Sequence, residues 1–262
     1  MKKFYVLITA LVSIGSATNG YAQESSKYTS KWLFKVSGGV NIPLTNMHQN
    51  RETDYLIEYS DKTQMEPSLS ATWFIRERFG IEAKLKPSSF NELTVSRKHF
   101  QEMIDKKYGE NYYTSIRTPL TSEPNMGVSL GLVYRIETER MYFYPKFAIG
   151  ITPFHLDWTY VNLKEKNTNN EYAVNYYPEK MERSGFTLIP SVSVGYKLSK
   201  RIWVDLSVNT SYFKANFAYD KTFENLYTKE TQTEHISYNK SVFDTYASLG
   251  IVYVISSKKH KK

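Results

Sequence analysis

Hydrophobic and polar residues alternate one by one over long stretches of this chain. In residues 191–208 (SVSVGYKLSKRIWVDLSV) the apolar side chains fall on one face of an extended backbone, and Ser193, Lys197 and Asp205 fall on the other. A period of two is typical of a β-strand, whose side chains point alternately to the two faces of a sheet. The pattern is interrupted once, at 199–201, which predicts a tight turn between two antiparallel strands.

The same alternation recurs in eight segments of at least about ten residues, the length that a tilted strand needs to cross a bilayer. These segments are residues 31–42, 67–76, 79–89, 125–136, 141–152, 185–198, 201–215 and 241–255. Short charged turns alternate with long connections of about 24, 35, 32 and 25 residues. In an antiparallel barrel of consecutive strands, this order collects the short turns at one rim and the long loops at the other.

Aromatic residues mark one end of the predicted strands. On the apolar face, next to the short turns or the chain ends, seven of the eight segments carry one: Trp32, Trp73, Phe79, Tyr134, Phe143, Tyr196 and Tyr253. The middle of this face is mostly aliphatic, as at Val194, Val204 and Leu249. Because aromatic rings collect at the level of lipid head groups, we predict that the apolar face meets lipid and that these residues form a periplasmic-side girdle.

The opposite face of the strands carries the charged residues. They are Lys35, Glu82, Lys84, Arg135, Lys146, Lys197, Asp205 and Asp244. A charge turned toward lipid costs roughly 2–4 kcal/mol near the midplane, whereas opposite charges inside a narrow tube can neutralise one another. We therefore predict an all-β, eight-stranded antiparallel up-and-down transmembrane β-barrel with short periplasmic turns, long extracellular loops and a charge network in its lumen.

The ends of the chain differ from its alternating part. Residues 1–22 combine two lysines, an apolar run and a series of small residues, the layout of a secretory signal peptide. We assign 23–255 to the barrel and 256–262 to a basic periplasmic tail. The formal net charge is +8, of which the signal peptide contributes two and the lysines of the tail four. The nearly balanced remainder argues against nucleic acid as a partner, and the absence of cysteine excludes disulfides and thiolate metal sites.

The signal peptide, the eight alternating segments, the KLSKRIWVDLSV hairpin and the rhythm of the loops resemble the small OmpA/OmpX-type outer-membrane β-barrels, in particular the outer membrane protein β-barrel domain family. The resemblance covers most of the mature chain. It implies a monomer in the outer membrane of a Gram-negative bacterium, in contact with outer-membrane lipid and lipopolysaccharide and inserted by the barrel-assembly machinery.

Two histidine motifs are candidate catalytic sites. His235-Ile236-Ser237 resembles the His-x-Ser arrangement of outer-membrane lipid A deacylases, in which the histidine activates the serine. His155 stands two residues before Asp157, so a carboxylate could orient its imidazole. The remaining histidines have no metal-ligand spacing. Because a loop histidine is usually only solvated, we predict no enzyme, no metal and no cofactor, with a lipid A-modifying enzyme as the alternative.

The long loops hold twelve of the 22 tyrosines. Tyrosine offers a large contact area at low entropic cost, which suits recognition surfaces, although the same rings could pack the loops against one another. Residues 97–109 (RKHFQEMIDKKYG) predict a short helix on the rim. We predict a structural or surface-interaction role, with an extracellular protein or glycan bound by the loops. A small passive channel is a further hypothesis for the function, and a soluble lipocalin-like carrier is the rival fold.

Overall fold

The computed structural model describes residues 31–45, 53, 56, 63–87, 93–117, 126–168 and 170–256. The predicted signal peptide (1–22) lies outside these residues, and so do residues 257–262 of the predicted tail. Within the described part of the chain, no helix has both the length and the apolar character needed to span a membrane.

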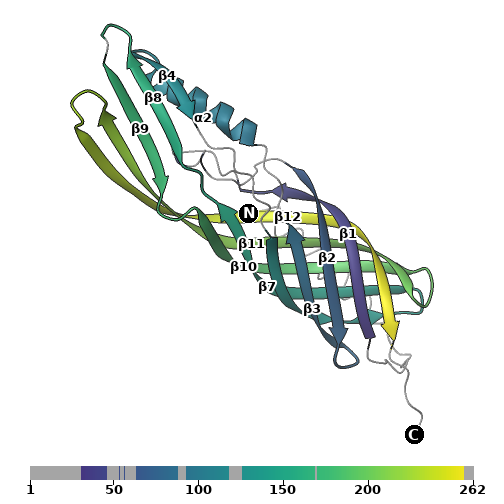
Figure 1. Cartoon of the computed structure of the whole chain (residues 1–262). Helices are drawn as coiled ribbons and strands as arrows, with labels where there is room; N and C mark the ends of the chain where they lie inside the picture. Colours follow the sequence, from purple (N-terminus) through teal and green to yellow (C-terminus); the bar gives the residue numbers. More distant parts are fainter. Residues whose placement is uncertain are drawn as a thin grey trace, which may run out of the picture.

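Twelve strands of the described part form one antiparallel sheet (Figure 1). Eight of them match the predicted segments within a few residues, although β11 and β12 run on well past them. They are β1 (Lys31–Pro43), β2 (Gln64–Phe74), β3 (Phe79–Pro87), β5 (Met126–Tyr134), β7 (Met141–His155), β10 (Glu182–Lys197), β11 (Ile202–Asn225) and β12 (Thr231–Ser256). The others are β4 (Tyr112–Arg117), β6 (Ile136–Glu137), β8 (Thr159–Glu165) and β9 (Glu171–Pro178), and one helix, α2 (Leu93–Tyr108), precedes β4.

Eight strands close into a ring. Their order is β10-β7-β5-β3-β2-β1-β12-β11, and a further pairing of β10 with β11 completes the circle. The first and last strands are hydrogen-bonded neighbours over 13 residue pairs, from Lys31 with Ser256 to Pro43 with Asp244. Closure leaves no free strand edge in the ring. The predicted all-β class is confirmed.

Residues that alternate along the sequence face alternately the outside and the inside of this ring. In β1 the even-numbered residues from Trp32 to Ile42 face outward, and the odd-numbered ones between them are buried. Leu249 on β12 is 62% exposed, whereas Asp205 on β11 is only 2% exposed. The apolar face therefore points outward and the charged face inward, the reverse of a soluble lipocalin-like carrier, which buries its apolar face.

Three of the predicted loops contain strands in the structure. β11 and β12 have 24 and 26 residues and continue past the ring as one long hairpin, where the sequence had predicted a loop of about 25 residues. β9, β8 and β4 then add one after another to the edge of β11. Figure 1 shows this outer sheet projecting from one end of the ring, with α2 beside β4 and β8. We call β4, β8, β9, α2 and the projecting part of the β11/β12 hairpin the outer unit.

Candidate functional site

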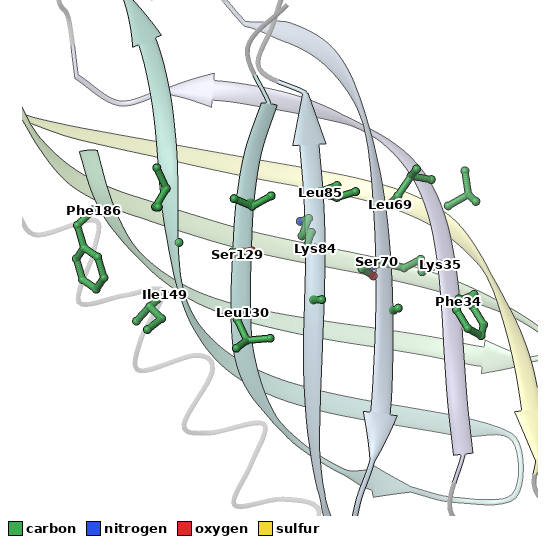
Figure 2. A pocket seen from close by; sticks show the side chains of 16 residues that line it. Phe34, Lys35, Leu69, Ser70, Lys84, Leu85, Ser129, Leu130, Ile149 and Phe186 are labelled. Carbon is green, nitrogen blue, oxygen red and sulfur yellow. The ribbon is translucent and has the colours of Figure 1, made fainter. Parts of the chain in front are cut away.

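The outside of the ring is a continuous apolar wall. Figure 2 shows Phe34, Leu69, Leu85, Leu130, Ile149 and Phe186 on neighbouring strands of this wall. The polar residues that line the same hollow, such as Ser70 and Lys84, belong to the inner face of their strands. A ligand site needs a few convergent polar groups for orientation, and the outward side chains here offer none. The hollow in Figure 2 is therefore part of the wall that acyl chains would cover.

Aromatic side chains stand on the outer wall at both rims. The seven residues predicted as a girdle lie near the short-turn rim, where Trp32 stacks on Trp73 at 5.5 Å between ring centroids. At the opposite rim, Tyr212 and Phe243 pair at 4.7 Å. On β11, the level of the girdle is marked by Ile202, the cross-strand partner of Tyr253, and the level of the opposite rim by Tyr212. The two residues are ten positions, or roughly 33 Å, apart along the strand. A tilt of about 40° reduces this length to roughly 25 Å, the height of an outer-membrane apolar band.

The middle of the lumen holds a network of buried ion pairs. Lys35 donates to Asp205 at 2.9 Å, and Lys146 donates to Glu82 at 2.6 Å. The Tyr142 hydroxyl donates to the second oxygen of Asp205 at 2.6 Å. All eight residues of the predicted lumen network lie on the inner face of the ring, among them Lys84, Arg135, Lys197 and Asp244. The sequence did not place Glu66 and Lys86 in the lumen, and they form a further pair there at 2.6 Å.

Glu137 is the centre of a second cluster, at the short-turn rim. Arg135 and Lys197 contact its carboxylate at 2.7 and 2.8 Å, and Lys31 lies at 3.7 Å. Tyr144 also donates to it. Sequence reasoning had assigned Glu137 to the turn 137–140 and so missed it. The residue belongs instead to the short strand β6, which pairs with β7 and turns the carboxylate inward.

Apolar and aromatic side chains fill the lumen beside Glu137. The buried set is Leu33, Phe74, Val133, Tyr142, Tyr144, Trp203, Val252 and Val254. Trp203 donates its indole N–H to the Ser199 carbonyl at 3.1 Å, and its ring lies 5.1 Å from the Lys197 ammonium. Its side chain is 2% exposed. We call this set, together with the Glu137 cluster, the floor of the lumen, because it fills the tube at the short-turn rim.

The outer unit has a hydrophobic core of its own. Phe100 and Ile104 of α2 are buried against β8, β9 and the β11/β12 hairpin, and Phe100 meets Tyr176 edge to face at 5.8 Å. Tyr176 and Tyr219 have no exposed surface. Burial among its neighbours, with Tyr172 and Glu165 nearby, raises the pKa of Tyr112. Many loop tyrosines therefore pack the outer unit, while others face water: Tyr113, Tyr177 and Tyr227 are 64%, 49% and 64% exposed.

The helix predicted over 97–109 is present, and its packing gives a direct test. We expect Ile104→Ala to destabilise the outer unit by about 2 kcal/mol, because it leaves a cavity against the sheet. Limited proteolysis of intact cells should cut this unit faster. The heat-modifiable gel shift of the ring should persist. Glu102→Ala, on the exposed side of the same helix, is the control and should change neither; equal protease resistance of the two variants would contradict the packing.

The two histidine motifs lie in the outer part of the molecule and show no catalytic arrangement. His155 Nε2 is 3.9 Å from Asp157. His235 Nδ1 is 2.8 Å from Asp220, its cross-strand partner, which the sequence spacing did not reveal. Ser237 is two positions along the strand from His235, roughly 7 Å, and no hydrogen bond joins the two among the described residues. A nucleophile and its base need about 2.6–3.2 Å.

A closed ring of antiparallel strands with an apolar outside, aromatic rims and a charged interior defines an outer-membrane β-barrel. The location predicted from the sequence, the outer membrane of a Gram-negative bacterium, is therefore the one that the surface of this molecule requires.

No family model matches the sequence, and no curated protein matches it significantly. Among solved structures, a major outer membrane protein of Thermus thermophilus is 9% identical with a TM-score of 0.42, covering 87% of this chain and 100% of its own. Neisserial surface protein A is 10% identical with a TM-score of 0.40 (86% and 99%). The attachment invasion locus protein Ail of Yersinia pestis is 9% identical with a TM-score of 0.37 (87% and 100%). Such distant similarity says nothing about what this chain binds.

Proposed function

We propose that this protein is a monomeric eight-stranded transmembrane barrel that displays the outer unit at the cell surface, where it binds an extracellular protein or glycan. The short turns and the basic tail then face the periplasm, and the barrel-assembly machinery inserts the ring among outer-membrane lipid and lipopolysaccharide. The observation that carries the proposal is the outer unit itself, which has its own apolar core and presents exposed tyrosines beyond the ring.

A surface that binds a partner should depend on its exposed aromatic residues. Tyrosine and other aromatic side chains contribute most of the energy at many interfaces. We expect cells that carry Tyr113→Ala, Tyr177→Ala and Tyr227→Ala together to bind at least about tenfold more weakly, a loss of ~1.4 kcal/mol. The probes are arrays of purified extracellular-matrix proteins and of neutral and sulfated glycans.

The control for the tyrosine variant is a triple replacement of polar residues in the same unit: Lys164→Ala, Gln232→Ala and Thr233→Ala. All three side chains are exposed, and this control should bind as the wild type does. Equal binding by wild type, control and a chain without the outer unit would reject the surface-interaction role and leave a structural one.

A passive channel is the second candidate, and the floor of the lumen argues against it. Trp203, Phe74 and Tyr144 fill the tube at one rim, and an eight-stranded ring leaves an interior that side chains just fill. We expect purified protein in planar bilayers to give no stable single-channel current. Steady conductance by the wild type would overturn this expectation and favour the channel.

A lipid A-modifying enzyme is the third candidate. His235 lies eight residues beyond Phe243, the aromatic level of the outer rim, and thus roughly 26 Å farther along β12. That position is remote from lipid acyl groups. We propose that the protein is not an enzyme, and mass spectrometry of lipid A from cells with and without it tests this directly; an altered acyl pattern would reverse the proposal.

A further inference from the structure

Two lysines flank a buried serine on the inner face of the ring. Lys35, Ser70 and Lys84 are direct cross-strand neighbours on β1, β2 and β3, and Ser129 on β5 follows Lys84. Figure 2 shows the four residues in one row across neighbouring strands. Side chains at directly opposed positions start about 5 Å apart. The two ammonium groups and the two hydroxyls therefore share one small region of the lumen wall.

Three inner-face carboxylates of this region are engaged by other lysines. Asp205 accepts from Lys35, Glu82 accepts from Lys146, and Glu66 pairs with Lys86. Lys35, Lys146 and Lys86 are each paired in this way. Within the described residues, Lys84 has no carboxylate in ion-pair range, and its ammonium lies 5.0 Å from the centre of the Tyr246 ring. Lys84 is therefore the lysine of this group without an ion-pair partner among the described residues.

The serine between the lysines is also unsatisfied. Ser70 is 8% exposed, and its hydroxyl makes no hydrogen bond with any residue that the structure describes. A buried hydroxyl without a partner costs about 1–3 kcal/mol. A buried ammonium without a counter-charge costs more. A single anion would relieve both at once, accepting from the serine hydroxyl while neutralising the lysine.

We propose that the lumen binds one chloride-sized inorganic anion between Lys84 Nζ and Ser70 Oγ, with Lys35 completing the positive surroundings. A larger organic anion would have to displace neighbouring side chains, because eight strands leave an interior that side chains just fill. The Lys86 side chain, two residues farther along β3, is 26% exposed, so water and small ions reach the neighbouring level. The anion supplies the counter-charge that Lys84 lacks and stabilises the folded ring.

Bromide is the probe for this site, because it replaces chloride and scatters anomalously. In crystals of the full chain soaked in sodium bromide, we expect an anomalous peak between Lys84 Nζ and Ser70 Oγ. The absence of a peak there overturns the proposal and means that Lys84 is held without a counter-ion. This measurement uses the wild-type protein and does not depend on whether a variant folds.

Thermal unfolding in detergent, followed by the heat-modifiable gel shift, tests the same site in solution. Chloride at ten times its dissociation constant should raise the folding equilibrium constant about tenfold relative to gluconate at equal ionic strength. Lys84→Met should abolish this chloride response and Ser70→Ala should weaken it. Lys164→Met, whose side chain is 54% exposed in the outer unit, should retain it. An unchanged response in Lys84→Met overturns the proposal.

Discussion

Replacing Glu137 by glutamine is expected to destabilise the folded ring by about 3 kcal/mol. Its side chain is 4% exposed, and its carboxylate is shared by Arg135, Lys197 and Lys31. The amide removes the negative charge and leaves three largely buried cations facing one another. Breaking one partner of a buried ion pair typically costs about 3–5 kcal/mol. Urea unfolding of the protein refolded into lipid vesicles measures the change.

Two further variants identify the cause of this loss. Glu139→Gln changes the same residue type in the turn that follows β6, at an exposed position, and should be within about 0.5 kcal/mol of the wild type. Adding Lys197→Gln to Glu137→Gln removes one of the unpaired cations, so the double variant should be more stable than Glu137→Gln alone. If the double variant is less stable, the network is held by packing and not by its charges.

Leu206→Arg is expected to cost about 2–4 kcal/mol in a bilayer. Leu206 is 56% exposed on the outer wall and lies near the middle of the part of β11 between Ile202 and Tyr212, which mark the two aromatic levels. In water such a substitution at an exposed site would be harmless. In lipid, the guanidinium must stay in hydrocarbon or distort the bilayer to reach the interface. The variant should insert poorly into vesicles and unfold at lower urea concentration.

Leu206→Ala is the matched control, since it shortens the same side chain without adding charge. A second control is Lys214→Arg on the same strand, past the outer rim, where a charge already meets water. We expect both to fold nearly as well as the wild type. Should Leu206→Arg match them, or make the protein soluble without detergent, the outer wall does not face lipid and the membrane assignment fails.

The eight ring strands follow from local sequence alone. A period of two over ten residues leaves one face apolar, as Val204 and Leu206 show on β11, and the face of Asp205 polar. The charged turns set the order of the strands, because consecutive antiparallel strands need only a few residues between them. The aromatic residues next to these turns, such as Tyr196, decided which face meets lipid. The lumen residues could be predicted because they occupy the polar positions of the same alternating pattern.

The strands of the outer unit could not be predicted from this alternating pattern. β8 has seven residues and β4 has six, too short to stand out as strands, and they exist only because the edge of β11 and the core around Phe100 and Ile104 hold them. Short strands gain stability from neighbours more than from their own residues.

Pairing between distant residues was likewise decided by the closed ring. Lys35 and Asp205 are 170 positions apart, and Asp220 meets His235 only through the register of β11 and β12. Glu137 lies in the lumen because the pairing of β6 with β7 turns its carboxylate inward. The sequence by itself determined which face of each strand is apolar and how the ring strands follow one another, since both depend on neighbouring residues. The tertiary structure alone decided which charges meet and where the loops fold, because these contacts depend on strand register and on closure of the sheet.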